Sequence, residues 1–337
     1  MTATARDSRP AATRQRHQRR RRRVRILTRR DRVVLGLLIG IPLLLDIAFV
    51  WFPALASVGL SFTNWTGVGG IRLHSCDQYP TVPGIPRPFG CLDGAENYRE
   101  AFTIDPQFWP AVRHNAIWLG VFIVLATPLG MLFAVLIDRG LRGGRIYQSV
   151  LFLPVMLSLA LIGIIWELIY APDRGLINTV IGRNHNNNLI DWLGDKHLSL
   201  WSILVEASWR QAGYVMVLYL AGLKAVDPAL REAATVDGAN AWQTFRHVVF
   251  PALKPINVVI LVVTVIESLR AFDLVYITYK GNPHLGTELL SVLVTQYIVG
   301  ETQRIGLGST FGVILLVIAL VPITIFLVNN LRREEKP

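Results

Sequence analysis

The amino-acid sequence predicts an all-α, polytopic membrane protein with six transmembrane helices and both termini in the cytoplasm. Two observations carry this prediction. The chain of 337 residues is 52% hydrophobic with a mean hydropathy of +0.42, values that soluble domains rarely reach. Its lysines and arginines also gather in alternate segments between the apolar runs, and such residues accumulate on the cytoplasmic side of membrane proteins.

Six segments are apolar and long enough to cross a bilayer, which requires about 20 residues. They cover residues 33–60, 117–137, 150–170, 198–223, 256–276 and 308–328. If both termini lie inside, the cytoplasmic segments hold 23 lysines and arginines and the external segments hold nine. Because cytoplasmic loops carry the excess of basic residues, we expect this orientation.

The chain divides into a basic cytoplasmic tail over residues 1–32, a transmembrane domain over 33–330 and a short cytoplasmic tail over 331–337. Thirteen arginines lie between Arg6 and Arg32. A nucleic-acid-binding arm has this composition, but an apolar segment follows at once. The composition therefore favours a tail that sets topology and contacts anionic lipid, with membrane lipid and no nucleic acid as its partner.

The first external loop, residues 63–110, is rich in proline and glycine and contains the two cysteines, Cys76 and Cys91. Extracytoplasmic space is oxidising, so we expect a Cys76–Cys91 disulfide, with two unpaired thiols as the alternative. Two cysteines and seven scattered histidines predict no metal cluster. The sequence also has no phosphate-binding loop of the GxxxxGK type. We therefore expect no metal, no bound cofactor and no catalytic residue in this chain.

Residues 224–255 separate the fourth and fifth predicted spans, and they predict a helix, a turn and a second helix. Asp227 suits the cap of a first helix, and Gly238 can adopt the left-handed conformation that ends it. Asn240 and Gln243 then have the spacing of a capping box. A plain loop needs none of these features, so we expect a rigid cytoplasmic projection that inserts into a groove of a partner.

The second helix of this projection has an apolar face and an end marked by proline. Trp242, Phe245 and Val249 fall on one side of a helix. Pro251 and Pro255 are expected to end the helix before the next span.

Within this projection the sequence resembles a known family. Glu232-Ala233-Ala234, Gly238 six residues after Glu232, and Phe250-Pro251 resemble the cytoplasmic EAA loop of permease subunits in binding-protein-dependent ABC importers. The family's pattern places isoleucine and leucine where this chain has Val248 and Phe250.

Three neighbouring segments are similar to the carbohydrate-uptake subgroup of these permeases, on the side of the maltose or glycerol-phosphate first permease. They are FLPVMLSLALIGIIWELIYAPDRGLIN (152–178), LYLAGLKAVDPALREAA (218–234) and ESLRAFDLVYITYKGNP (267–283). Many relatives have TGGP after the fifth span, where this chain has YKGNP. The contacts that this loop makes in the family therefore stay open here.

The resemblance covers residues 32–330 and implies the type I ABC importer permease fold, with an EAA loop that docks onto an ATP-binding subunit. The residues it assigns to coupling are Glu232, Ala233, Ala234, Asp237, Gly238 and Pro251. It further implies a heterodimer with a second permease subunit, two ATP-binding subunits that hold ATP and Mg, and an extracytoplasmic substrate-binding lipoprotein. The implied location is a bacterial cell membrane, and the chain itself is not expected to be an enzyme.

Polar side chains inside the fourth and fifth spans mark a candidate substrate pathway, because ionisable groups are costly there. Aromatic rings can stack on sugars while charged and amide groups bond hydroxyls. The candidates are Trp209, Gln211, Tyr214, Arg270, Phe272, Asp273 and Tyr276. The alternative is that the charges neutralise one another along one helix face, Glu206 with Arg210 and Glu267 with Arg270.

We therefore expect a permease subunit of an ATP-driven importer for a sugar or oligosaccharide. The acidic Glu267 and Asp273 favour a neutral substrate, and a glycerol-phosphate importer is the alternative. An ion-coupled secondary transporter would also have six spans but would leave the EAA loop without a role. A membrane enzyme, or a sensor with a nucleic-acid-binding tail, has no supporting motif in the sequence.

Overall fold

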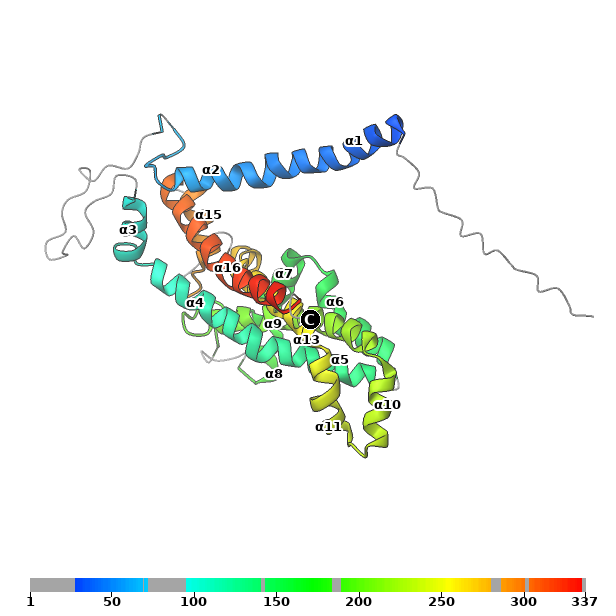
Figure 1. Cartoon of the computed structure of the whole chain (residues 1–337). Helices are drawn as coiled ribbons and strands as arrows, with labels where there is room; N and C mark the ends of the chain where they lie inside the picture. The colour runs from blue at the N-terminus through cyan, green and yellow to red at the C-terminus, as the bar shows by residue number, and fades with distance from the viewer. Residues whose placement is uncertain are drawn as a thin grey trace, which may run out of the picture. The chain divides into compact units, whose positions relative to one another are not determined.

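The computed structural model describes residues 28–68, 70–71, 95–140, 143–183, 189–279, 286–300 and 303–334. Over these residues every regular element is a helix (Figure 1). The chain divides into two units, Met1–Pro53 and Ala54–Pro337, which are described separately. Cys76 and Cys91 lie outside the described residues, as does the basic tail up to residue 27. The disulfide therefore stays a prediction.

The first unit consists of α1 (Arg29–Asp46), the π-helical η1 (Ile47–Trp51) and the start of α2 (Phe52–Leu60). Thr28 and Asp31 form a capping box that fixes the beginning of α1. After its charged first turn the helix is apolar except for Asp46, and none of its residues is buried within the described chain. A helix with this composition requires lipid or another subunit around it.

The second unit contains short helices and long ones. In chain order they are α3 (Glu96–Thr103), α4 (Phe108–Val121), η3 (Phe122–Ala126), α5 (Thr127–Asp138), α6 (Gly144–Met156), α7 (Leu159–Tyr170), α8 (Leu176–Val180), α9 (Ser199–Ala225), α10 (Pro228–Val236), α11 (Ala241–Thr244), η4 (Phe245–Val249), α12 (Phe250–Ala252), α13 (Lys254–Leu269), α14 (Asp273–Thr278), α15 (Leu290–Ile298) and α16 (Ile305–Glu334).

Across both units, three helical stretches of the described residues have the length and composition of a membrane span. They are Arg29–Leu60, Phe108–Asp138 and Ile305–Thr324. Three further pairs of helices pass the same test together but are bent, by 103° between α6 and α7, by 71° between α9 and α10, and by 70° where the stretch Ala241–Ala252 meets the stretch from Lys254. Counting each bent pair as one span gives up to six, so the six-span topology is compatible with the structure and stays a prediction.

Two of the spans that the sequence predicts as continuous helices are broken. Within the predicted span 150–170, α6 ends at Met156 and a new helix, α7, begins at Leu159. The Ser158 hydroxyl caps α7 by accepting a hydrogen bond from the Leu161 amide at 3.2 Å. The predicted span 256–276 is interrupted between α13 and α14. Hydrophobic length alone does not reveal such breaks, because a serine cap or a short unwound segment barely changes the average hydropathy.

The predicted second span, 117–137, is longer than expected and begins inside the predicted external loop. The helix starts at Phe108, and the loop also contains α3. Tyr297 and Arg304, which lie near the ends of α15 and α16, bond Asp105 and Glu100 of this region. Burial, followed by the bond to Asp105, raises the pKa of Tyr297 above its ordinary value.

The three π-helical turns in the described residues each end two residues before a proline. The amides of Phe52, Thr127 and Phe250 each donate to a carbonyl five residues earlier, and Pro53, Pro128 and Pro251 follow. Proline lacks an N–H and its ring crowds the carbonyl four residues before it. A wider turn just ahead of the ring accommodates that carbonyl without ending the helix.

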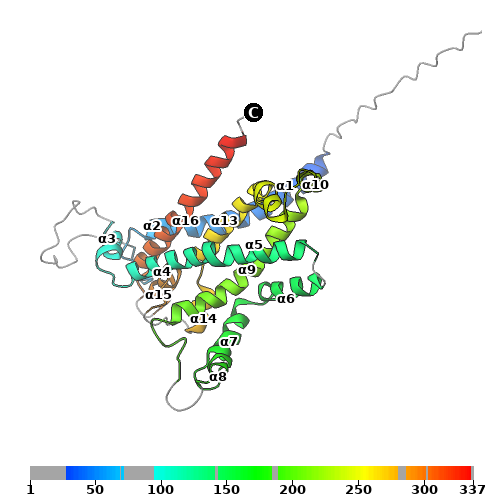
Figure 2. The same cartoon turned by 90° about the horizontal axis from the view of Figure 1, so that it is seen from below.

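The core of the second unit is the contact between α5 and α9, which run side by side (Figure 2). Gly130 of α5 lets the two backbones approach closely, since a Cβ at this position would lie 2.7 Å from the Ala212 carbonyl oxygen and 2.8 Å from the Cβ of Val215. Small residues at helix contacts allow this approach in membrane proteins. The two helices therefore form one tightly packed pair.

We predict that Gly130→Ala lowers the thermal unfolding temperature of the detergent-solubilised protein, because an added methyl group overpacks this contact at a cost of about 1–3 kcal/mol. Gly120→Ala is the matched control on α4, where a Cβ meets nothing within 4 Å. Alanine there should be neutral or stabilising. Equal unfolding temperatures for the two variants would contradict the close approach of α5 and α9.

Candidate functional site

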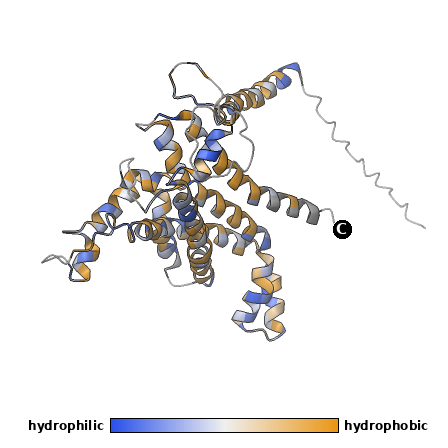
Figure 3. Cartoon of the chain, turned by 90° about the vertical axis from the view of Figure 1, so that its left-hand side faces the viewer, coloured by the Kyte–Doolittle hydropathy of each residue, from blue (hydrophilic) through white to orange (hydrophobic). Residues whose placement is uncertain are grey.

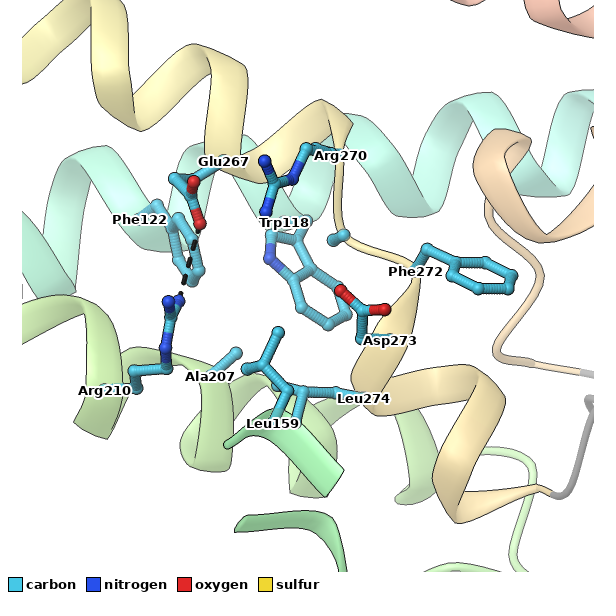
Figure 4. A pocket seen from close by; sticks show the side chains of 11 residues that line it. Trp118, Phe122, Leu159, Ala207, Arg210, Glu267, Arg270, Phe272, Asp273 and Leu274 are labelled. Atoms are coloured by element: carbon cyan, nitrogen blue, oxygen red, sulfur yellow. Dashed lines mark hydrogen bonds and ion pairs between the residues drawn. The ribbon is translucent and has the colours of Figure 1, made fainter. Parts of the chain in front are cut away.

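A small cavity lies where α4, α7, α9, α13 and α14 meet (Figure 4). Its volume is about 40 Å³. The residues that line it are Trp118, Phe122, Leu159, Ala207, Arg210, Glu267, Arg270, Ala271, Phe272, Asp273 and Leu274. The lining thus combines aromatic rings with two positive and two negative side chains. We call this cavity the central pocket.

The charges in the central pocket come from different helices. Arg210 of α9 and Glu267 of α13 face each other with Nη1 and Oε2 3.4 Å apart (Figure 4). About a quarter of each side chain is exposed. Arg270 and Asp273 flank this pair on the segment that joins α13 to α14. The formal charges of these four residues cancel.

This pairing corrects the expectation that the charges neutralise one another along single helices. Glu267 pairs with Arg210 on another helix and not with Arg270. No ion pair joins Glu206 to Arg210 in the described residues: Glu206 is buried at 1% exposure beside Gly163 of α7, and Arg210 pairs with Glu267. A spacing of three or four residues permits a pair on one helix, but the packing of α9 between α7 and α13 separates these side chains onto different contacts.

The break between α13 and α14 delivers residues to the pocket. Arg270 caps the end of α13, and Asp273 begins α14. The intervening Ala271 carbonyl would be left without an intrahelical partner, and the Ser291 hydroxyl donates to it at 2.6 Å. The unwound backbone is therefore satisfied, as a segment inside a membrane must be.

Three of the seven predicted pathway residues line the central pocket: Arg270, Phe272 and Asp273. The other four, Trp209, Gln211, Tyr214 and Tyr276, do not line it. Of these, Trp209 packs edge-on against Trp166 of α7 with ring centroids 5.9 Å apart, and Tyr276 packs at a tilt against Phe272 with ring centroids 4.8 Å apart.

The second span also contributes an aromatic wall to the pocket, which was not predicted from the sequence. Trp118 and Phe122 are four residues apart, with ring centroids 6.1 Å apart. Their spacing in an apolar span was the available signal, but a buried aromatic pair usually belongs to the core. Arg210 and Glu267 also line the pocket, and they were not predicted there because each has an oppositely charged residue three or four positions away on its own helix.

The central pocket offers hydrogen-bond donors but little space. Trp118 Nε1 and Arg210 Nε are buried and have no hydrogen-bond partner among the described residues. Buried donors of this kind are usually bonded to water or to a ligand. A cavity of about 40 Å³ is nevertheless far smaller than typical ligand sites of about 300–1,000 Å³. The helices around the pocket must separate before anything larger than a few water molecules can enter.

A second candidate site is the projection formed by α10, α11, η4 and α12, residues 228–252, which we call the hairpin (Figures 1 and 3). The predicted helix, turn and second helix are confirmed. The Asp227 carboxylate accepts a hydrogen bond from the Ala229 amide at 2.9 Å and so caps the start of α10. Asn240 and Gln243 form the expected capping box at the start of α11.

Gly238 makes the turn of the hairpin, as the sequence predicts. Its φ is +77°, a conformation that costs other residues about 1–2 kcal/mol. The Ala239 amide donates to the Ala234 carbonyl and the Gly238 amide to that of Thr235. These two bonds form the motif that ends a helix with a left-handed glycine.

One expectation about the hairpin is wrong. Pro251 does not end the second helix, because the π turn η4 absorbs it and the helix continues through α12 to Ala252. The chain then turns at Leu253, and Pro255 lies in the first turn of α13, where a proline costs no hydrogen bond.

Most of the predicted coupling residues face outward on the hairpin. Glu232, Ala233, Asp237, Gly238 and Pro251 are exposed, and Ala234 is buried against the second helix. Large apolar side chains are exposed beside them: Val236 is 87% exposed and Trp242 is 64% exposed. Exposed apolar groups gathered on one projection are typical of a protein-binding surface.

Comparison with known proteins gives relatives over most of the chain. The xylose/arabinose import permease protein XacH of Haloferax volcanii is 30% identical over 76% of this chain and 75% of its own length. The trehalose/maltose transport system permease protein MalF of Thermococcus litoralis is 29% identical over 89% of this chain and 95% of its own length.

The fold is also that of a solved transporter subunit. A chain in the crystal structure of a bacterial ABC transporter involved in the import of the acidic polysaccharide alginate superposes with a TM-score of 0.71. The match covers 91% of this chain and 97% of that chain, at 20% identity. The predicted all-α permease fold is therefore confirmed, although the number of spans and their orientation are not tested by this match.

The match to a protein family covers more than half of the chain. Residues 126–335, which include α9, the hairpin and α13, match the inner membrane component of binding-protein-dependent transport systems. This chain therefore belongs to the family of binding-protein-dependent transport system inner membrane components.

Proposed function

We propose that this chain is a permease subunit of an ATP-driven importer, and that it translocates a sugar or oligosaccharide delivered by an extracytoplasmic binding protein. The observation that carries the proposal is the hairpin. It places an exposed Glu232 and a left-handed Gly238 on a rigid helix–turn–helix between two apolar helices. A secondary transporter has no need of such a projection.

The hairpin has the rigidity and the exposed apolar side chains expected of an element that docks into a groove on an ATP-binding subunit. Capping bonds fix both of its helices, so little conformational entropy is lost when it binds. Its exposed Val236 and Trp242 gain by leaving water, at about 25 cal/mol per Å² of apolar surface. Two ATP-binding subunits, one for this chain and one for a second permease subunit, would hold ATP and Mg.

The exposed apolar helix of the first unit is evidence for the proposed second permease subunit. The stretch Arg29–Leu60 has a mean hydropathy of 2.6 and none of that apolar window is buried within the described chain. Association of two permease subunits as a heterodimer would give this helix a protein surface to pack on, with lipid covering the rest.

The substrate class rests on the relatives and on the chemistry of the central pocket. The relatives named above are permeases for xylose/arabinose and trehalose/maltose. The pocket offers aromatic rings and paired charges that suit a neutral polyhydroxyl ligand. A glycerol-phosphate ester is the alternative, and Arg270 would be its partner, since no ion pair joins Arg270 to another described residue. Binding of neutral sugars, sugar acids and glycerol phosphate to the external binding protein separates these classes.

The first prediction of this function concerns docking. Glu232→Ala should abolish co-purification of the ATP-binding subunit and substrate uptake while leaving the unfolding temperature unchanged, because Glu232 is exposed. Asp173→Ala is the control, since it removes an exposed carboxylate from the segment between α7 and α8. Retained co-purification and uptake in Glu232→Ala would overturn the docking role of the hairpin.

The second prediction concerns the shape of the hairpin. Gly238→Val should reduce ATPase co-purification, whereas Gly238→Asn should largely retain it. A β-branched residue is strongly disfavoured at positive φ, while asparagine tolerates it. A Cβ at this position meets nothing within 4 Å, so the two variants differ in backbone strain rather than in contacts. Equal loss in both would show that strain at Gly238 is not the cause.

The third prediction concerns topology in the proposed bacterial cell membrane. Single cysteines at Val68 and Val236, which are 81% and 87% exposed, should lie on opposite sides. In a background with Cys76 and Cys91 replaced by serine, a membrane-impermeant thiol reagent added to spheroplasts should label Val68→Cys and spare Val236→Cys until the cells are lysed. The reverse pattern would place the hairpin outside, against the basic-residue distribution.

A further inference from the structure

Arg231, the residue before Glu232, joins the hairpin to the ends of two long helices. Its Nη1 donates to Asp138 Oδ2 at 2.8 Å, and its Nη2 donates to the Leu223 carbonyl oxygen at 3.1 Å. Asp138 is the last residue of α5, and Leu223 lies in the last turn of α9. We call these three groups the Arg231 clamp.

The clamp compensates two unfavourable features at these helix ends. An aspartate at the C-terminus of a helix faces the negative end of the helix dipole, and Asp138 occupies that position in α5. The Leu223 carbonyl is among the last four of α9, which have no intrahelical partner. The Arg231 guanidinium offsets both features, because its planar group donates to the Asp138 carboxylate and to the Leu223 carbonyl at once and fixes their relative position.

The two helices that end at the clamp also form walls of the central pocket. The continuous helix 108–138 contributes Trp118 and Phe122, and α9 contributes Ala207 and Arg210. At about 1.5 Å per residue, Asp138 lies about 24 Å along its helix from Phe122, and Leu223 about 20 Å from Arg210. Because α5 and α9 are tightly packed at Gly130, a displacement at their ends is carried along the pair.

We propose that Arg231 is the positioning residue that transmits movement of the hairpin to the central pocket. This inference rests on the proposed function, in which an ATP-binding subunit moves the hairpin. It goes beyond that function because it assigns transmission to one guanidinium and to the α5–α9 pair. Asp138 is outside the hairpin, so it can be changed without touching the docking surface.

The experiment measures a response of the pocket to nucleotide and needs no transported substrate. Ala271, which lines the pocket, is replaced by cysteine in a background with Cys76→Ser and Cys91→Ser. The complex with its ATP-binding subunits is purified, and the rate of modification by N-ethylmaleimide is measured with and without Mg-ATP and orthovanadate. With the clamp intact, trapping should change this rate about fivefold or more, the lower end of typical coupling between distant sites.

Asp138→Asn keeps the size of the side chain but removes its charge. In this variant the ATP-binding subunit should still co-purify and basal ATP hydrolysis should persist, while the nucleotide-dependent change at Ala271→Cys should fall to about twofold or less. Asp138→Glu restores the charge and should restore the response. Arg231→Lys keeps its charge but cannot hold both acceptors, so its response should be intermediate.

Three outcomes would overturn the proposal. A full response in Asp138→Asn would show that the pocket moves without the clamp. Loss of the ATP-binding subunit from Asp138→Asn would show that the ion pair shapes the docking surface instead. A pocket that fails to respond even with the clamp intact would also exclude transmission. By contrast, retained docking in Glu232→Ala overturns the proposed function of the hairpin, so the two hypotheses fail separately.

Discussion

A membrane-spanning chain must satisfy every backbone hydrogen bond without water, and this constraint explains most irregular features of the structure. A proline lies two residues after each of the three π turns in the described part of the chain, and these turns let the helix continue past a missing donor. Where the helix does stop, side chains replace the lost bonds: Ser158 caps α7 and Ser291 binds the Ala271 carbonyl in the break after α13. The irregularities are therefore local solutions to one requirement, and the helical fold persists through them.

The same requirement determines where polar chemistry can lie. A regular helix hides its backbone and offers only side chains, whereas a break changes the direction of several side chains within a few residues. Arg270 and Asp273 lie at the two ends of the α13–α14 break and both reach the central pocket. Arg210 and Glu267 then face each other across two helices. A pair of charges in low dielectric is tolerated only when each has a partner, so the pocket depends on the packing of α9 against α13.

Local patterns were readable from the sequence because their causes are local. The caps at Asp227 and Asn240 and the left-handed turn at Gly238 each depend on residues within four positions, and the structure has all three. The helix breaks were not predicted, because unwinding at residues 270–272 depends on Ser291 from a distant segment. The pocket was predicted only in part for the same reason: Arg270, Phe272 and Asp273 were found, whereas Trp118 reaches the pocket only through the tertiary contact of α4 with α13 and α9.

The helix 108–138 has a rigidly packed part, α5, and one place where it can bend, η3. Its C-terminal part, α5, packs closely against α9 at Gly130 and is joined to the hairpin through Asp138. Its N-terminal part, α4, contributes Trp118 to the pocket wall. Between them lies η3, whose wide turn ends before Pro128 and so lacks the regular bonding that resists bending. A force applied at Asp138 would therefore move α5 as a rigid unit and bend the helix at η3, which begins at Phe122. The π turn next to Pro128 therefore lies beside the central pocket, which Phe122 lines, and under the proposed function this is where the wall would yield to a substrate.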